Sequence, residues 1–145
     1  MLAAARSLIP PGVAFGLFFL LWGSTVLALG LWVARDARER GSDQPVVWAL
    51  ASVFTPIGLP YYLWRRYRRS GLGDRAGPRS RTDRIVATWA SAGLCAFLGG
   101  AVLAPPDPIT QAFYAFGALA IALPLAYLLV YRGGYRTVTD RITDA

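Results

Sequence analysis

Residues 7–34 read SLIPPGVAFGLFFLLWGSTVLALGLWVA and carry no charged side chain over 28 positions. About 20 apolar residues in a helix, at ~1.5 Å of rise per residue, cross a bilayer core of ~30 Å. Unpaired backbone amides are costly in lipid, so a segment of this kind must be helical. The stretch therefore predicts a transmembrane helix. We expect it to be retained, because its apolar part is too long for a signal peptide.

Three further uncharged runs follow along the chain, at residues 44–64, 85–106 and 108–131, with 21, 22 and 24 positions. Each is long enough to cross a membrane. The sequence therefore predicts an all-α protein with four transmembrane helices. Helix-start signals precede two of the runs: Ser42 or Asp43 stands ahead of Pro45, and Asp107 stands directly ahead of Pro108.

The composition agrees with a membrane protein and excludes most catalytic chemistry. The chain is 55% hydrophobic and 16% charged, against about a quarter charged in soluble domains. All 15 basic residues are Arg, His is absent and Cys95 is the single cysteine. A catalytic triad, a zinc site of the usual kind and a Walker phosphate loop all need residues that this chain lacks. We expect no enzymatic activity, no cofactor and no metal, and we expect Cys95 to be a small buried side chain.

The distribution of Arg predicts the orientation in the membrane. Residues 65–84 hold eight Arg, whereas residues 35–43 hold three Arg balanced by three acids, and the connection around Asp107 holds none. Short loops rich in Arg stay in the cytoplasm. We therefore expect a multi-pass protein of the plasma membrane with both termini cytoplasmic. The three Arg of residues 35–43 do not fit this orientation, but eight outnumber three.

A weak internal similarity predicts how the spans are arranged. A shift of 64 residues aligns seven identical residues within 43–68 and 107–132, including Leu-Pro followed by Tyr-Arg. This pattern is typical of two tandem helical hairpins, although membrane sequences also resemble one another by composition. The expected parts are a first transmembrane hairpin (1–69), a cytoplasmic loop rich in Arg, Gly and Ser (70–83), and a second transmembrane hairpin with a short cytoplasmic tail (84–145).

Small residues spaced along one helix face favour close helix packing in lipid. The candidate packing residues are Gly16, Gly23, Gly30, Ala92, Ala96 and Gly100. They either hold the protein's own helices together or, in the first span, provide a face for a second copy or for another subunit.

Prolines inside two of the uncharged runs predict irregular helices. The candidate helix breaks are Pro56, Gly58, Pro60 and Pro124. Broken helices at matching positions of two halves are typical of transporter sites. Kinks whose freed backbone groups are satisfied by neighbours are the alternative, and the absence of charge from all four runs favours it.

Four arginines directly follow the second uncharged run, at Arg65, Arg66, Arg68 and Arg69. At a cytoplasmic membrane surface such a cluster attracts anionic headgroups with about 1 kcal/mol per residue. The alternative is that these arginines only set the topology. Nucleic-acid binding is not expected, because no fold around so short a loop would present the arginines in a groove.

Two short stretches resemble known families. Residues 27–38 (LALGLWVARDAR), followed by Trp48 and by the pattern Pro56-x-Gly58-x-x-Tyr61-Tyr62-Leu63, resemble the N-terminal membrane module of cardiolipin synthase and phospholipase D proteins. The catalytic motif of that family needs His and Lys, and this chain has neither. The resemblance therefore implies only an anchoring role. Residues 105–111 (PPDPITQ) look like a turn of the twin-arginine translocase core subunit.

Together these patterns predict an accessory, anchoring or assembly component of the membrane. It would act by helix packing and by its cytoplasmic arginine patch, with anionic lipids and either a second copy or a larger membrane complex as partners. The alternatives are a small oligomeric transporter or pore that uses the proline-broken second and fourth spans, and a regulator that binds anionic lipid.

Overall fold

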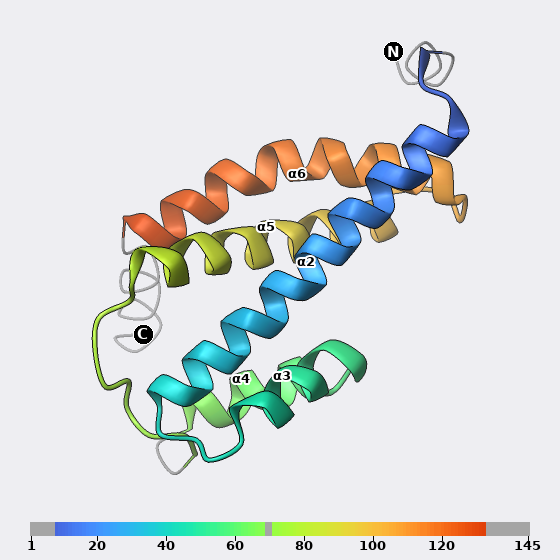
Figure 1. Cartoon of the computed structure of the whole chain (residues 1–145). Helices are drawn as coiled ribbons and strands as arrows, with labels where there is room; N and C mark the ends of the chain where they lie inside the picture. Colours follow the sequence, from blue (N-terminus) through green and yellow to red (C-terminus); the bar gives the residue numbers. More distant parts are fainter. Residues whose placement is uncertain (1–7, 69–70, 133–145) are drawn as a thin grey trace, which may run out of the picture. The chain divides into compact units, whose positions relative to one another are not determined.

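The computed structural model describes residues 8–68 and 71–132, and over them the chain is helical without any strand (Figure 1). The helices are α2 (Pro11–Glu39), α3 (Pro45–Phe54), α4 (Gly58–Tyr67), α5 (Arg81–Leu103) and α6 (Pro108–Tyr131). The prediction of an all-α fold is confirmed.

The number of transmembrane helices differs from the prediction. Among the described residues three helices are long and apolar enough to cross a membrane, namely α2, α5 and α6. The second uncharged run instead forms α3 and α4, of 10 residues each. A helix of that length is about 15 Å long, which is half of a bilayer core. The expectation of four spans is therefore wrong, because the second run is interrupted at its centre.

The interruption lies at residues 55–57, between α3 and α4. Thr55 ends α3 in an extended conformation, and its hydroxyl donates a hydrogen bond of 2.7 Å to the carbonyl of Ala51. Pro56 has no N–H with which to continue the helix. A Cβ atom on Gly58 would lie 1.9 Å from the carbonyl oxygen of Ala51, so the turn requires glycine there.

The other two candidate breaks behave differently. Pro60 lies in the first turn of α4, where a missing N–H needs no partner. Pro124 lies inside α6, which continues through it as one helix, so the expected break in the last span is not present. The two stretches aligned by the internal similarity thus differ in structure, since one forms two helices and the other forms one.

The two helix-start signals also have different outcomes. Asp107 is the N-cap of α6, and its carboxylate accepts hydrogen bonds from the backbone N–H of Thr110, at 2.9 Å, and from the Thr110 hydroxyl. At α3 the N-cap is Gln44 and its side chain makes no capping bond, so the prediction of Ser42 or Asp43 as the cap is wrong.

The chain groups into two compact units, and α2 and α5 contribute to both. One contains residues 8–25 and 91–132 of the described chain, and the other is Val26–Ala90. These units reflect spatial proximity. The division into 1–69, 70–83 and 84–145 concerns membrane topology and stays a prediction.

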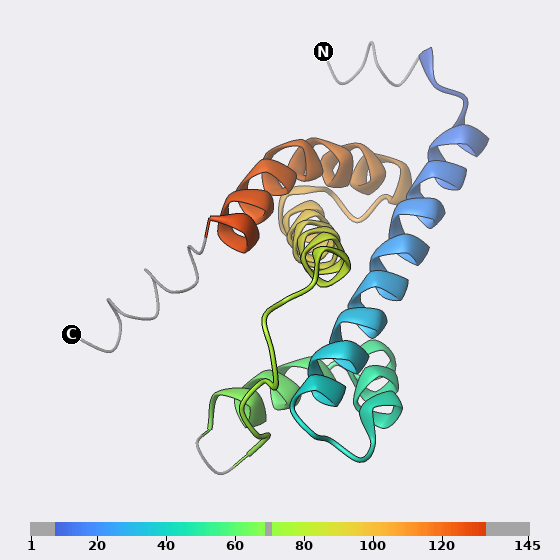
Figure 2. The same ribbon diagram turned by 60° about the vertical axis from the view of Figure 1, so that its left-hand side comes forward.

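In the first unit α5 packs closely against α2 and α6, and α5 and α6 run side by side in both views (Figures 1 and 2). A Cβ atom on Gly100 would lie 3.2 Å from the backbone nitrogen of Ala115, and one on Gly93 would lie 2.3 Å from the Thr25 hydroxyl. The rings of Phe18 and Phe97 meet edge to face at 5.5 Å. Small residues thus permit the close helix contacts in this unit.

The predicted packing residues fall into two groups. Ala92, Ala96 and Gly100 are buried, as a packing face requires. Added Cβ atoms on Gly16 and Gly23 would meet no atom within 4 Å, whereas one on Gly30 would touch Val53 at 3.5 Å. Gly93 of α5, whose added Cβ atom would lie 2.3 Å from the Thr25 side chain of α2, was not among those predicted.

Substitution of Gly93 by Val should destabilise the protein. The new side chain would collide with Thr25, and overpacking of this kind costs about 1–3 kcal/mol. We expect a lower thermal midpoint in mild detergent, measured by circular dichroism. The matched control is Gly117→Val, which adds the same side chain to an open face of α6. Equal losses in both variants would contradict this assignment.

Candidate functional site

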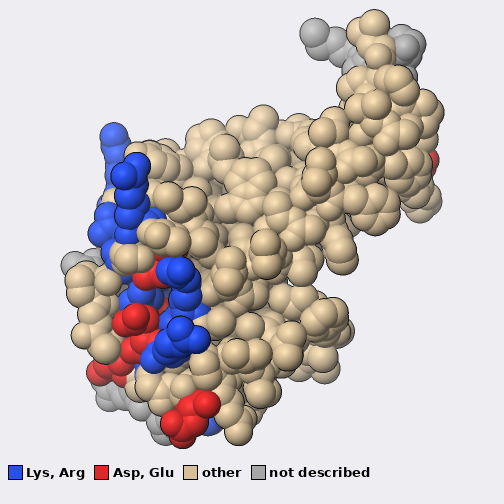
Figure 3. Space-filling model, in the orientation of Figure 1, with Lys and Arg blue, Asp and Glu red and all other residues tan. Residues whose placement is uncertain are grey.

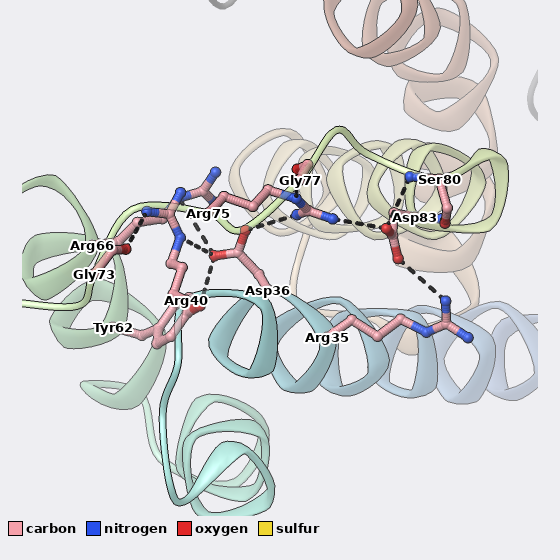
Figure 4. A network of polar contacts seen from close by, with 10 residues as sticks. All are labelled: Arg35, Asp36, Arg40, Tyr62, Arg66, Gly73, Arg75, Gly77, Ser80 and Asp83. Carbon is pink, nitrogen blue, oxygen red and sulfur yellow. Dashed lines mark hydrogen bonds and ion pairs between the residues drawn. The ribbon is translucent and has the colours of Figure 1, made fainter.

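The carboxylate of Asp36, near the C-terminal end of α2, lies at the centre of a polar network (Figure 4). Asp36 is only 1% exposed. Its Oδ2 accepts hydrogen bonds from Arg40 Nε at 3.0 Å and from the Tyr62 hydroxyl at 2.7 Å. Its Oδ1 accepts from Arg75 Nη1 at 3.3 Å. One buried carboxylate therefore joins α2, α4 and the segment that leads to α5.

Asp83 extends this network into the first turn of α5. Arg75 Nη2 donates to Asp83 Oδ2 at 2.8 Å, and Arg35 Nη1 donates to Oδ1 at 3.2 Å. The Ser80 hydroxyl accepts from the N–H of Asp83, while the Asp83 carboxylate accepts from the N–H of Ser80, each at 3.1 Å. This reciprocal pair is a capping box, which fixes where α5 begins. Arg75 thus bridges the two aspartates.

Because the network is buried, its carboxylates depend on the side chains around them. A buried carboxylate is tolerated only when hydrogen bonds and opposite charges replace its water. Each oxygen of Asp36 and Asp83 has a donor within 3.3 Å. Burial raises the pKa of the Tyr62 hydroxyl, and the hydrogen bond to Asp36 raises it further, so the phenol stays protonated and donates.

Backbone contacts fasten the segment after α4 to the end of α2. The N–H of Ala76 donates to the carbonyl of Glu39 at 2.9 Å, and Arg40 Nη1 donates to the carbonyl of Gly73 at 3.2 Å. A Cβ atom on Gly71 would lie 2.0 Å from the carbonyl oxygen of Arg65, so glycine allows the chain to pass the end of α4 there. Residues 71–76 therefore lie directly against residues 39 and 40.

The structure separates the four predicted arginines. The Arg66 side chain is 9% exposed, its Nε lies 3.6 Å from Asp36 Oδ2, and its guanidinium lies 5.1 Å from the ring of Trp32. Arg66 therefore belongs to the Asp36 network. Arg65 and Arg68 do not join it, and Arg69 lies outside the described residues.

Arg65 and Arg68 each lie over a tryptophan. The Arg65 guanidinium is 5.4 Å from the ring of Trp48, and that of Arg68 is 4.2 Å from the ring of Trp64. Tyr61 stacks between the two indoles, with ring centroids 5.9 Å from Trp48 and 5.8 Å from Trp64. We call these five residues the Arg–Trp surface. Figure 3 shows basic and acidic side chains gathered beside a wide uncharged area.

Sequence reasoning missed the network because the acids were assigned to separate polar loops. Asp36 and Arg40 stand four residues apart, a spacing that predicts an ion pair once α2 is known to continue to Glu39. Ser80 and Asp83 stand at capping-box spacing. Nothing local in the sequence indicates Tyr62 or Arg75 as their partners. Cys95, expected to be buried, is exposed.

Among residues 8–68 and 71–132, no group of three or more Cys, Asp or Glu side chains is placed to hold a metal ion. Comparisons with protein families, with curated proteins and with solved structures found no match. The resemblances to the cardiolipin synthase module and to the translocase turn therefore stay predictions.

Substitution of Asp36 by Asn should destabilise the protein strongly. The variant would leave Arg40, Arg66 and Arg75 gathered around a neutral amide, and breaking a buried ion pair costs about 3–5 kcal/mol. We expect a large drop in the free energy of unfolding, measured by chemical denaturation in detergent.

The matched control is Asp74→Asn, which removes the same charge at an exposed position of the segment that leads to α5. It should leave the free energy of unfolding within about 0.5 kcal/mol of the unmodified protein. If the two variants lost the same stability, the network would not be the source of the effect.

Proposed function

We propose that this chain is an integral protein of the plasma membrane that anchors or assembles membrane components by holding anionic phospholipids on its Arg–Trp surface. Three apolar helices supply the membrane insertion. The side with most of the Arg faces the cytoplasm, following the positive-inside rule. The proposal includes no catalytic activity of its own, since the chain has no His and no Lys.

The observation that carries the proposal is the position of the Arg65 and Arg68 guanidiniums over the rings of Trp48 and Trp64. A guanidinium that lies with its face over an indole keeps N–H groups along its edge, and these bind a phosphate group in a bidentate manner. Indole and phenol rings favour the headgroup region. The surface thus combines hydrogen-bond donors for a phosphate group with aromatic rings suited to the headgroup region, where that phosphate lies.

Exposure of the rings supports the same conclusion. Trp64 is 51% exposed and Tyr61 is 46% exposed. About half of each of these side chains is therefore available to headgroups and to the upper part of the acyl chains. Arg66, which is turned inward to Asp36, holds the surface in place and takes no part in lipid binding.

The assembly part of the proposal concerns α2. Gly16 and Gly23 would accept added Cβ atoms without any contact within 4 Å, and large apolar side chains such as Phe19 and Leu20 are 60% and 70% exposed. Glycines on a lipid-facing helix allow close approach of another helix. A second copy or another subunit is the proposed partner of this face.

Lipid binding can be tested with the double variant Arg65→Gln and Arg68→Gln. Loss of about 1 kcal/mol for each Arg corresponds to about a 30-fold loss of affinity. We expect that loss for phosphatidylglycerol and not for phosphatidylcholine, measured by native mass spectrometry of the protein in mild detergent.

The matched control is Arg38→Gln with Arg81→Gln, which removes the same charge at two exposed positions outside the Arg–Trp surface. This control should retain most of the phosphatidylglycerol affinity. Equal loss in both double variants would show attraction by overall charge alone and would overturn the proposed site. Inorganic phosphate is added as a competitor to distinguish a lipid from a soluble phosphate as the ligand. Displacement of phosphatidylglycerol by phosphate at low concentration would indicate a site for a soluble phosphate, whereas retention of the lipid would indicate a lipid site.

A further inference from the structure

The two ends of the α3–α4 segment lie together. The Arg65 guanidinium, near the end of α4, lies 5.4 Å from the ring of Trp48, in the first turn of α3. Trp48 also stacks on Tyr61 at 5.9 Å. The two helices are therefore antiparallel, and the chain leaves the segment where it entered it.

The chain on either side of this segment is joined as well. The hydrogen bond between Ala76 and Glu39 measures 2.9 Å, and the one between Arg75 and Asp36 measures 3.3 Å. Groups within hydrogen-bond distance cannot lie on opposite faces of a bilayer core of ~30 Å. Residues 39–40 and 71–76 must lie on the same side of the membrane.

The far end of the hairpin is apolar and exposed. Phe54 is 77% exposed and Ile57 is 73% exposed, at the turn between the helices. Two backbone hydrogen bonds close the turn, since the N–H of Thr55 donates to Ala51 and that of Gly58 donates to Thr55. Pairing within the segment reduces the number of backbone groups that a turn in lipid leaves without a partner. The hairpin thus has an apolar tip and a base of Arg, Trp and Tyr.

We propose that α3 and α4 form a re-entrant hairpin. It enters the bilayer from the Arg-rich side, lies among the acyl chains of the cytoplasmic leaflet and returns to the same side. With α2, α5 and α6 as the three spans, residues before α2 then lie on the outer side and residues after α6 on the cytoplasmic side. This replaces the expectation that both termini are cytoplasmic.

The distribution of Arg supports this topology. In this topology fourteen of the fifteen Arg lie on one side of the membrane: three in residues 35–43, eight in residues 65–84 and three after α6. The three Arg of residues 35–43 no longer conflict with the positive-inside rule. The inference needs membrane insertion but does not need lipid binding by Arg65 and Arg68, so the two proposals can fail independently.

Labelling of single cysteines tests the topology. In a Cys95→Ser background, Asp43→Cys, Asp74→Cys and Pro105→Cys each place one thiol at an exposed position. A membrane-impermeant maleimide is added to intact spheroplasts or to inverted vesicles. We expect the thiols at positions 43 and 74 to react only in inverted vesicles and the thiol at position 105 to react only in intact spheroplasts.

Reaction at positions 43 and 74 from opposite sides would show that the segment between them spans the bilayer and would overturn the proposal. A measurement of the depth of position 54 in the bilayer tests whether the hairpin lies in lipid or in water. A fluorophore on Phe54→Cys should be quenched by lipids with a nitroxide near the bilayer centre, as should one on the native Cys95 of α5. Quenching at position 54 by a soluble quencher, with position 95 protected, would also overturn it.

Discussion

The ion pairs of Asp36 decide which of two arrangements the chain adopts. In the observed fold Asp36 on α2 contacts Tyr62 and Arg66 on α4 and Arg75 beyond it. If residues 44–64 formed one straight helix through the bilayer, Tyr62 and Arg66 would lie a membrane thickness away from Asp36. The carboxylate would then lose most of its partners. A carboxylate as buried as Asp36 needs these partners, so the observed network is compatible with the hairpin and not with a straight span.

The energetic meaning of this network is specificity more than stability. Buried ion pairs contribute little net free energy, since the cost of desolvation offsets the Coulomb attraction. A buried charge nevertheless requires its specific partners, because removal of one of them leaves the charge without compensation. Asp36 accepts a hydrogen bond from Arg40 on its own helix, which would form in either arrangement, and it also contacts Tyr62, Arg66 and Arg75, which would not be near in a straight span. The second group selects the fold.

The fold class follows from the sequence because runs without charge have few physical alternatives in lipid. The number of spans does not, because run length takes no account of the backbone. Pro56 and Pro124 both stand inside apolar runs, yet only the first coincides with a break. Thr55 before it bonds back to Ala51, and Gly58 after it permits a contact that a Cβ atom would block. The contacts that hold the segment after α4 against the end of α2, such as the one between Glu39 and Ala76, join positions too far apart for any local pattern to indicate.

The same limit applies to the candidate site. The arginines of α4 were evident as a cluster, but a helix turns about 100° per residue, so neighbours in sequence face different surroundings. Arg66 faces Asp36 and Trp32, whereas Arg65 and Arg68 face Trp48 and Trp64. The pairing of these arginines with the tryptophans depends on the antiparallel return of α4 along α3. That return could not be predicted without the break at Pro56.

The α4 helix links the Asp36 network to the Arg–Trp surface. Tyr62 and Arg66 join one face of this 10-residue helix to Asp36, Trp64 lies on another face, and Arg68 directly follows the helix as its C-cap. A short helix held in this way has little freedom to rotate, because rotation would remove Tyr62 and Arg66 from a buried carboxylate. The positions of Trp64 and Arg68 are therefore set by contacts within the protein. Under the proposed function, such preorganisation would lower the ordering cost of lipid binding, although the inward ion pairs would touch no lipid.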